Sequence, residues 1–140
     1  MSLENIDARG PRFSALLTTI VLAIALATNS ELLLALQAVV FAIGAIKGPQ
    51  ATPYAAIFRK FVKPRLKSEA KFEDVRPPQF AQRVGLGLAL VGLFGAVAAP
   101  VLFQVAVAFA LAAAFLNAAF DFCLGCQIYL LFARLRAKQA

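Results

Sequence analysis

The sequence predicts an all-α membrane protein with four transmembrane helices, arranged as two hairpins with both termini in the cytoplasm. Composition is the first reason: 61% of the 140 residues are hydrophobic and 15% are charged, whereas about a quarter of the residues in a soluble domain are charged. The second reason is that the hydrophobic residues form long blocks and not one stripe per helix. The third is that the basic residues gather at the ends of these blocks.

Four apolar runs approach the roughly 20 residues that a helix needs to cross a bilayer core. A polar break, Asn29–Glu31, separates the first pair, and Pro100 interrupts the second pair because proline ends or kinks a helix. We interpret the first run as a retained span and not as the apolar part of a signal peptide. The four runs are Phe13–Thr28, Leu32–Ile46, Val84–Ala99 and Val101–Phe122.

One membrane domain covers residues 1–140, with hairpin one at about 13–47, a basic loop at about 48–79 and hairpin two at about 80–133. The basic residues precede hairpin one, fill the loop and follow hairpin two, while the two short hairpin turns carry none. We therefore expect a multi-pass protein of the inner (plasma) membrane. The positive-inside rule places both of its termini and the loop in the cytoplasm. Five basic residues are expected to contact anionic lipid headgroups or a partner protein, and not nucleic acid: Arg59, Lys60, Lys63, Arg65 and Lys67.

The two hairpins have similar lead-in segments. "DARGPRF" (Asp7–Phe13) shares Asp, Arg, Pro and Phe, at the same spacings, with "DVRPPQF" (Asp74–Phe80). This similarity predicts a parallel internal repeat, in which both units enter the membrane from the same side. Pro77 and Pro78 predict extended chain before the third span, because the residue ahead of a proline avoids helix.

Small residues recur at helical spacing in the second hairpin, and they predict where its helices pack closely. In the third span they are Gly85, Ala89, Gly92, Ala96 and Ala99, and in the fourth they are Ala106, Ala110 and Ala113.

The segment "FDFCLGCQIY" (Phe120–Tyr129) contains both cysteines of the chain, Cys123 and Cys126. Disulfides at a cytoplasmic face are seldom structural, so the first interpretation is a redox dithiol that exchanges with a soluble thioredoxin-like protein. A sulfur carrier would use the same two thiols. A zinc or iron–sulfur site would need two chains, since each supplies two cysteines and no histidine. Simple packing is the fourth interpretation. No cofactor is predicted for a single chain.

Asp121 is the acidic residue inside the last apolar run, where an ionised side chain is costly. We expect it to form a salt bridge with Arg83, or failing that with Lys47. On one continuous helix Asp121 would share a face with Asn117 and not with Cys123. Hydrogen bonds between helices are expected from two further polar side chains, Asn117 and Gln104.

Two segments together resemble a bacterial membrane family, the domain of unknown function 4395. They are "EDVRPPQFAQRVG" (Glu73–Gly85) and "NAAFDFCLGCQIYLL" (Asn117–Leu131). The resemblance covers nearly the whole chain and implies four spans. It also implies an association with thioredoxin-like and sulfurtransferase proteins. Family members often carry glycine where this chain has Asp121, but the rest of the cysteine motif is present as Cys123, Leu124, Gly125, Cys126 and Tyr129.

The expected function is thiol–disulfide or sulfur exchange at the cytoplasmic face, with Cys123 as the attacking thiolate. The main alternative is an accessory subunit of a larger membrane complex, or a homo-oligomer, in which the cysteines only pack. A transporter is the third possibility, and it would need more polar residues in the spans than the first hairpin offers.

Overall fold

The computed structural model describes residues 5–7, 9–65, 72–74, 76–120 and 124–139, and these are almost entirely helical. The predicted all-α class is therefore confirmed, apart from one pair of three-residue strands. In chain order the elements are β1 (Asn5–Asp7), α1 (Arg9–Thr28), α2 (Glu31–Lys47), η1 (Pro49–Ala51), α3 (Pro53–Ile57), η2 (Phe58–Val62), η3 (Lys63–Arg65), β2 (Phe72–Asp74), α4 (Arg76–Ala98), α5 (Pro100–Phe120) and α6 (Leu124–Gln139).

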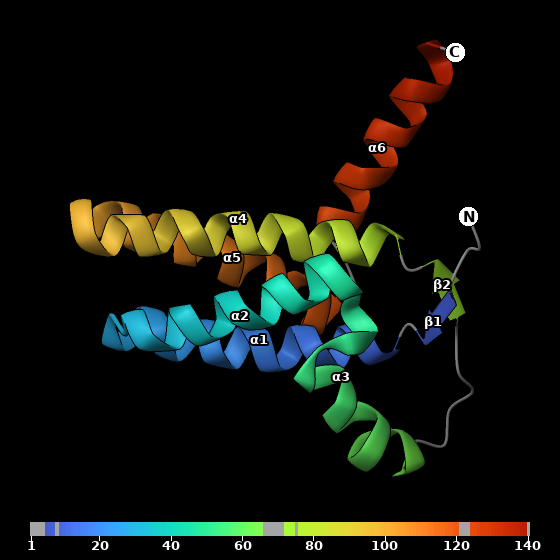
Figure 1. Ribbon diagram of the computed structural model, residues 1–140, viewed down its shortest axis with the longest axis horizontal. Helices are drawn as coiled ribbons and strands as arrows, with labels where there is room; N and C mark the ends of the chain where they lie inside the picture. The colour runs from blue at the N-terminus through green and yellow to red at the C-terminus, as the bar shows by residue number, and fades with distance from the viewer. Residues whose placement is uncertain (1–4, 8, 66–71, 75, 121–123, 140) are drawn as a thin grey trace.

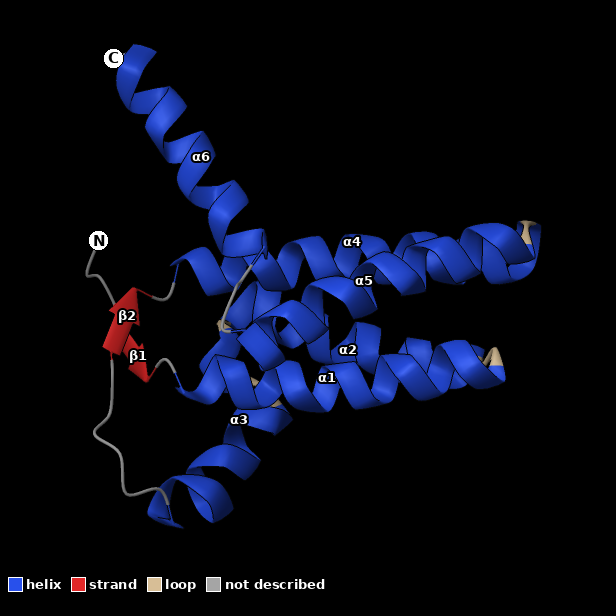
Figure 2. Ribbon diagram, turned by 180° about the vertical axis from the view of Figure 1, so that it is seen from behind, coloured by secondary structure: helices blue, strands red, loops and turns tan. Residues whose placement is uncertain are grey.

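Helices α1, α2, α4 and α5 form a bundle with their long axes roughly aligned (Figure 1). Each helix packs against two others, so that α1, α2, α4 and α5 follow one another around a closed ring. The helical segment that begins with α3 and the C-terminal helix α6 leave the bundle at one end, which is the end that carries the strand pair (Figure 2).

Three of these helices are long and apolar enough to cross a membrane: Arg9–Thr28, Pro78–Ala98 and Pro100–Phe120. They correspond to the first, third and fourth predicted spans. Helix α2, the predicted second span, has 17 residues, at the lower end of the usable range of about 17 to 25. Its outward side is nevertheless apolar, since Leu32, Leu36, Val39 and Ile46 are all exposed.

Two predicted boundaries differ from the observed ones. Helix α4 begins at Arg76 and includes Pro77 and Pro78, so the extended segment predicted there was wrong. Proline is tolerated in the first turn of a helix, because the N–H that it lacks would have no intrahelical partner there. Helix α5 ends at Phe120, two residues before the predicted end of the fourth span, and a further helix, α6, begins at Leu124 and was not predicted as a separate element.

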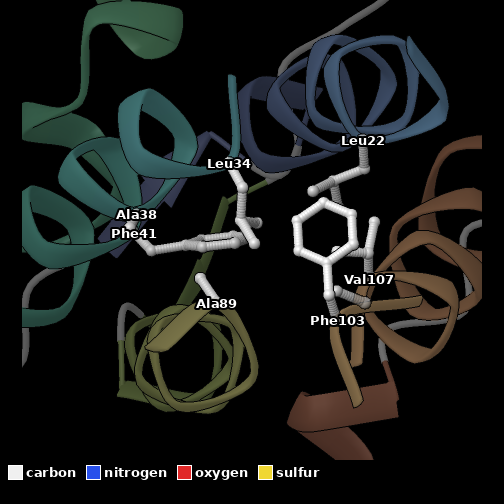
Figure 3. Close-up of a cluster of buried hydrophobic side chains, with 8 residues drawn as sticks. Leu22, Leu34, Ala38, Phe41, Ala89, Phe103 and Val107 are labelled. Carbon is white, nitrogen blue, oxygen red and sulfur yellow. The ribbon is translucent and has the colours of Figure 1, made fainter. Parts of the chain in front are cut away.

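The core lies between the four bundle helices and combines large side chains with small ones. Leu22, Leu34, Phe103 and Val107 are almost completely buried and meet at its centre (Figure 3). Because lipid supplies no hydrophobic drive for association, such helices depend on close van der Waals packing. The fit is tight: a Cβ built on Gly92 would lie 2.9 Å from a methyl carbon of Leu34.

The predicted small-residue stripes lie at these contacts. Gly85, Ala89 and Gly92 are buried on α4, and Ala106 and Ala110 are buried on α5. A Cβ on Gly85 would lie 2.7 Å from the ring of Phe41. These positions therefore have to stay small for α2 to approach α4.

The strands β1 and β2 join the two lead-in segments. They pair antiparallel, with Asn5 opposite Asp74, Ile6 opposite Glu73 and Asp7 opposite Phe72. This long-range pairing was not predicted from the sequence. It brings together the two segments whose similarity suggested a repeat.

Candidate functional site at the start of helix α6

The candidate site is the first turn of α6, which begins at Leu124, the residue after Cys123. Gly125 lies against the beginning of α4: a Cβ built on it would be 2.7 Å from both Cα and Cβ of Ala81. Any side chain at position 125 would therefore push the two helices apart. The glycine between the cysteines thus permits a close contact of α6 with α4.

An aromatic contact continues this interface one turn further along α6. The rings of Phe80 and Tyr129 have centroids 5.8 Å apart and are tilted by 55°. Tyr129 lies four residues after Gly125, so both lie on the same face of α6. Together they fix the first turns of α6 against α4.

Cys126 is half-buried in this first turn and is disulfide-bonded. The chain's other cysteine, Cys123, lies outside the residues that the structure describes, as does Asp121. The expectation that Asp121 faces away from Cys123 was based on one continuous helix. Since both residues lie outside the described residues, this expectation stays a prediction.

Arg12 ties α1 to the end of α5, just ahead of the cysteine segment. Its Nε donates a hydrogen bond of 3.1 Å to the carbonyl oxygen of Ala118, two residues before the described end of α5. The guanidinium also suits the negative end of the helix dipole. A positive charge is thereby held near the described end of α5, three residues before Asp121 in the sequence.

Arg83, the expected partner of Asp121, has a different contact among the described residues. Its Nε donates to the carbonyl oxygen of Ala45 at 3.3 Å, and the side chain of Gln79 donates to the same oxygen at 3.0 Å. Both bonds connect α4 to the last turn of α2. Since Asp121 lies outside the described residues, the predicted ion pair stays a prediction. Of the other polar candidates, Asn117 is half-buried and Lys47 is exposed.

Gln104 makes a hydrogen bond between helical hairpins, as expected. Its Nε2 donates to Oδ1 of Asn29 at 3.5 Å, which connects α5 to the turn between α1 and α2. Asn29 has a positive φ of 51°, a conformation that asparagine tolerates better than most residues do.

The basic segment after α3 is exposed and carries apolar side chains among its charges. Arg59 donates to the carbonyl oxygen of Gln50 at 2.7 Å, and Nζ of Lys60 lies 5.5 Å from the ring centroid of Phe61. Phe61 itself is 56% exposed, which is unfavourable in water. Of the remaining predicted contacts, Lys63 is in η3, Arg65 is exposed and Lys67 lies outside the described residues.

A buried polar cluster that joins α1, α2 and α3 was not predicted from the sequence. Gln37 is 1% exposed; its Nε2 donates to Oγ1 of Thr18 at 3.4 Å, and its Oε1 accepts a 2.7 Å bond from the hydroxyl of Tyr54. Burial raises the pKa of the Tyr54 hydroxyl. A glutamine inside an apolar run was the available signal. Its partners could not be identified from sequence, because they lie on two other helices.

The described residues contain no group of three or more histidine, cysteine, aspartate or glutamate side chains that could hold a metal ion.

Comparison with known proteins places this chain in a family. No curated protein and no solved structure matches it. The family model described as Domain of unknown function (DUF4395) matches residues 6–134, which include every helix of the bundle and the first turns of α6. The chain therefore belongs to the DUF4395 family.

Proposed function

We propose that Cys123 and Cys126 form an exchange site for thiols or sulfur at the cytoplasmic face of the membrane, used by a soluble thioredoxin-like or sulfurtransferase protein. One observation carries the proposal: the two cysteines flank the first two residues, Leu124 and Gly125, of a 16-residue helix that leaves the bundle. A thiol at a helix N-terminus is acidified, because the partial positive charge there stabilises its thiolate.

Two local features support reactivity at this position. Arg12 adds a fixed positive charge near the end of α5, and a nearby cation also lowers the pKa of a thiol. Gly125 lets α6 start in contact with α4, so the half-buried Cys126 sits on a rigid support. The disulfide at Cys126 is one of the two states that an exchange site must visit.

The exchange step balances without a further reagent. The thiolate of Cys123 attacks a disulfide of the partner, forming a mixed disulfide and releasing one partner thiolate. The thiolate of Cys126 then attacks the Cys123 sulfur, closing a disulfide and releasing the second partner thiol. Two electrons and two protons pass to the partner in this direction, and the reverse sequence oxidises it.

A four-span topology is part of the proposal, and the strand pair supports it. β1 and β2 are hydrogen-bonded, so the two segments lie on one side of any membrane that the bundle crosses. An even number of crossings must then separate them. Because α1 is a candidate span, α2 is required to bring the chain back. The basic residues that flank the hairpins support the assignment of this side to the cytoplasm, in a protein of the inner (plasma) membrane.

An internal repeat is also part of the proposal. The first unit comprises residues 5–65 and the second unit residues 72–139. α1 and α4 begin at Arg9 and Arg76, which occupy the same place in the two similar lead-in segments. The strand register is symmetric as well, since Ile6 and Glu73, the central residues of β1 and β2, face each other. This arrangement is expected for parallel repeats related by an axis along the membrane normal.

An accessory subunit of a larger membrane complex is the alternative. The close fit of Gly125 on Ala81 favours it, because a packing role needs such a contact and no solvent access. The two proposals differ in whether the cysteines can be reached from water.

Graded alkylation in inverted membrane vesicles tests the proposal, with metal analysis of the same preparation. Rapid labelling by a membrane-impermeant reagent after reduction, abolished reversibly by a mild oxidant, would support exchange and give the thiolate pKa. Thiols that react only after detergent is added, in a protein without metal, would favour the accessory subunit. Two thiols masked by a stoichiometric metal would instead indicate a site shared between chains.

A further inference from the structure

Helix α6 is the one long helix that projects out of the bundle (Figures 1 and 2). Its first turns pack on α4, and its contact with α5 is much smaller. Beyond Tyr129 its large apolar side chains are exposed: Leu131 is 56% exposed, Phe132 53% and Leu135 47%. These residues are too few, and too close to charges, to cross a bilayer.

Three of the exposed apolar residues, Leu131, Phe132 and Leu135, form one stripe on α6, whereas Leu130, which is 41% exposed, lies about 140° from Leu135. At 100° per residue, Leu131 and Phe132 lie within about 60° of Leu135 around the helix axis. Arg134 and Arg136 lie about 100° to either side of Leu135. The sequence of α6, Leu124–Gln139, contains no acidic residue. An apolar stripe bordered by arginines is typical of helices that lie in a membrane interface.

We infer that α6 docks on the surface of an anionic bilayer, with the stripe of Leu131, Phe132 and Leu135 in the interface. Two observations favour a lipid surface as the occupant. Helix α6 starts close to the end of α5, a candidate span, so it begins at the level of the headgroups. Its charge is exclusively basic, which complements the anionic lipids of a cytoplasmic leaflet.

The first unit carries a comparable element at the same end of the bundle. After α3, the exposed Ile57 and Phe61 alternate with the exposed Arg59 and Lys60. Two such elements leave the bundle in different directions (Figure 1). Each would rest on lipid beside the bundle.

Docking also determines which way the candidate site faces. Cys126 lies about 180° from Leu135 and about 140° from Leu131 around α6. When the stripe enters the interface, Cys126 is on the face of α6 that points away from lipid. The docking of α6 does not depend on the proposed function. Its consequence, access of a soluble protein to Cys126, rests on that proposal.

The test compares two labels on opposite faces of α6 in the full chain. In a background of Cys123→Ser and Cys126→Ser, a fluorophore is attached at Leu135→Cys or, as the matched control, at Ala137→Cys, about 200° away around the axis. Each protein is reconstituted in vesicles with or without phosphatidylglycerol. Nitroxide-labelled lipid and acrylamide serve as quenchers. Because both cysteines are absent, the result is independent of thiol chemistry.

In anionic vesicles, we expect the label at position 135 to be quenched by the nitroxide lipid and the label at 137 by acrylamide. Adding Arg134→Gln and Arg136→Gln should lower the ratio of docked to free α6 about fivefold per arginine. Equal quenching of both labels by acrylamide would overturn the inference. So would shielding of position 135 from both quenchers, because a protein surface would then cover α6.

The unlabelled chain provides a second measurement, which applies even if the labelled variants fail to fold. Trypsin cleavage after Arg134 and Arg136 should be slower in anionic than in zwitterionic vesicles. Equal cleavage rates in the two lipids would contradict docking on an anionic surface.

Discussion

The two halves of the chain, the proposed repeat units at residues 5–65 and 72–139, make similar contacts and differ where the candidate chemistry lies. In the first unit the ring of Phe13 packs on Phe58 with centroids 5.8 Å apart, and in the second unit Phe80 packs on Tyr129 at the same distance. Phe13 and Phe80 hold the same place in the two lead-in segments. In each unit, therefore, the first long helix fixes the helix that follows the hairpin.

Hydrogen bonds between the two units also come in a matching pair. Arg12 of the first unit donates to Ala118, two residues before the end of α5, and Gln79 of the second unit donates to Ala45, two residues before the end of α2. Arg12 and Gln79 are again matching positions. Each unit thus satisfies a terminal carbonyl of the other.

The difference lies at the start of the helix that follows each hairpin. In the first unit, Thr52 caps α3 by accepting a 3.2 Å hydrogen bond from the backbone N–H of Ala55. In the second unit, the corresponding places, just before α6 and at its third residue, are Cys123 and Cys126. The comparison teaches that the shared features carry the fold, while one unit has thiols where the other has a structural cap.

The largest effect is expected from the cysteines. Cys126→Ser should trap a mixed disulfide between Cys123 and the partner protein, because the thiol that resolves it is absent. Non-reducing electrophoresis of membranes would detect the adduct. The matched control is Ala55→Ser, at the corresponding place in α3, which should trap nothing. Absence of an adduct in cells that contain thioredoxin-like proteins would contradict the exchange mechanism.

The next largest effect is expected at the glycines. Gly125→Ala should lower the free energy of unfolding by about 1–3 kcal/mol, because its Cβ would overlap Ala81. Gly87→Ala is the control, since nothing lies within 4 Å of a Cβ there. It should be neutral or stabilising by up to about 1 kcal/mol, as expected for alanine in place of glycine within a helix. Thermal unfolding in detergent measures both, and equal effects would show that α6 does not pack closely on α4.

A smaller effect is expected from Tyr54→Phe, which leaves Oε1 of the buried Gln37 without the hydroxyl donor. Hydrogen bonds in membrane proteins contribute about 0.6 kcal/mol on average and up to about 1.7. Tyr129→Phe is the control, since phenylalanine already occupies the matching place at Phe58. An equal loss of stability in the two variants would mean that the hydroxyl of Tyr54 does not stabilise Gln37.

The same tyrosine predicts a pH dependence. Burial raises the pKa of Tyr54 above its unfolded value of 10.0, so the neutral form is favoured in the folded state. Its contribution to stability is complete below pH 10 and decreases as the pH rises through the folded pKa. Alkaline unfolding monitored by circular dichroism should therefore be less steep in Tyr54→Phe.

The smallest effect is expected when Arg12 is replaced by glutamine, the residue type at the matching position 79. Arg12→Gln should change the free energy of unfolding by less than about 0.5 kcal/mol, because Gln79 makes the equivalent bond with an amide. Arg12→Ala should cost about 0.5–1.5 kcal/mol. If glutamine were as damaging as alanine, the charge of Arg12 and not its hydrogen bond would matter.

Much of the fold was predictable from local composition. Apolar runs predicted the long helices, and small residues such as Gly85 and Gly92 predicted the close contacts, because both signals depend on residues within one helix. The start of α4 was not predicted, since Pro77 is equally compatible with extended chain and with a first helical turn. The β1–β2 pair was missed because short strands depend on a distant partner.

The candidate site was predictable as a motif but not as a geometry. Cys123, Gly125 and Cys126 are adjacent in sequence, and their spacing suggested a dithiol. That Gly125 touches Ala81 and that Arg12 reaches Ala118 could not be inferred. Both contacts join helices that are far apart in the chain, and only packing of the whole bundle brings them together.

The tight fit of the glycines on α4 has a consequence for biosynthesis. The first hairpin is made before Gly85 and Gly92, which later receive Phe41 and Leu34. While the ribosome is still translating the basic segment, α2 can pack on α1, but the face that later meets α4 has no partner from the second half of the chain. β1 likewise waits for β2. The bundle therefore stays half-finished during synthesis, and it can close only after α4 and α5 have been made.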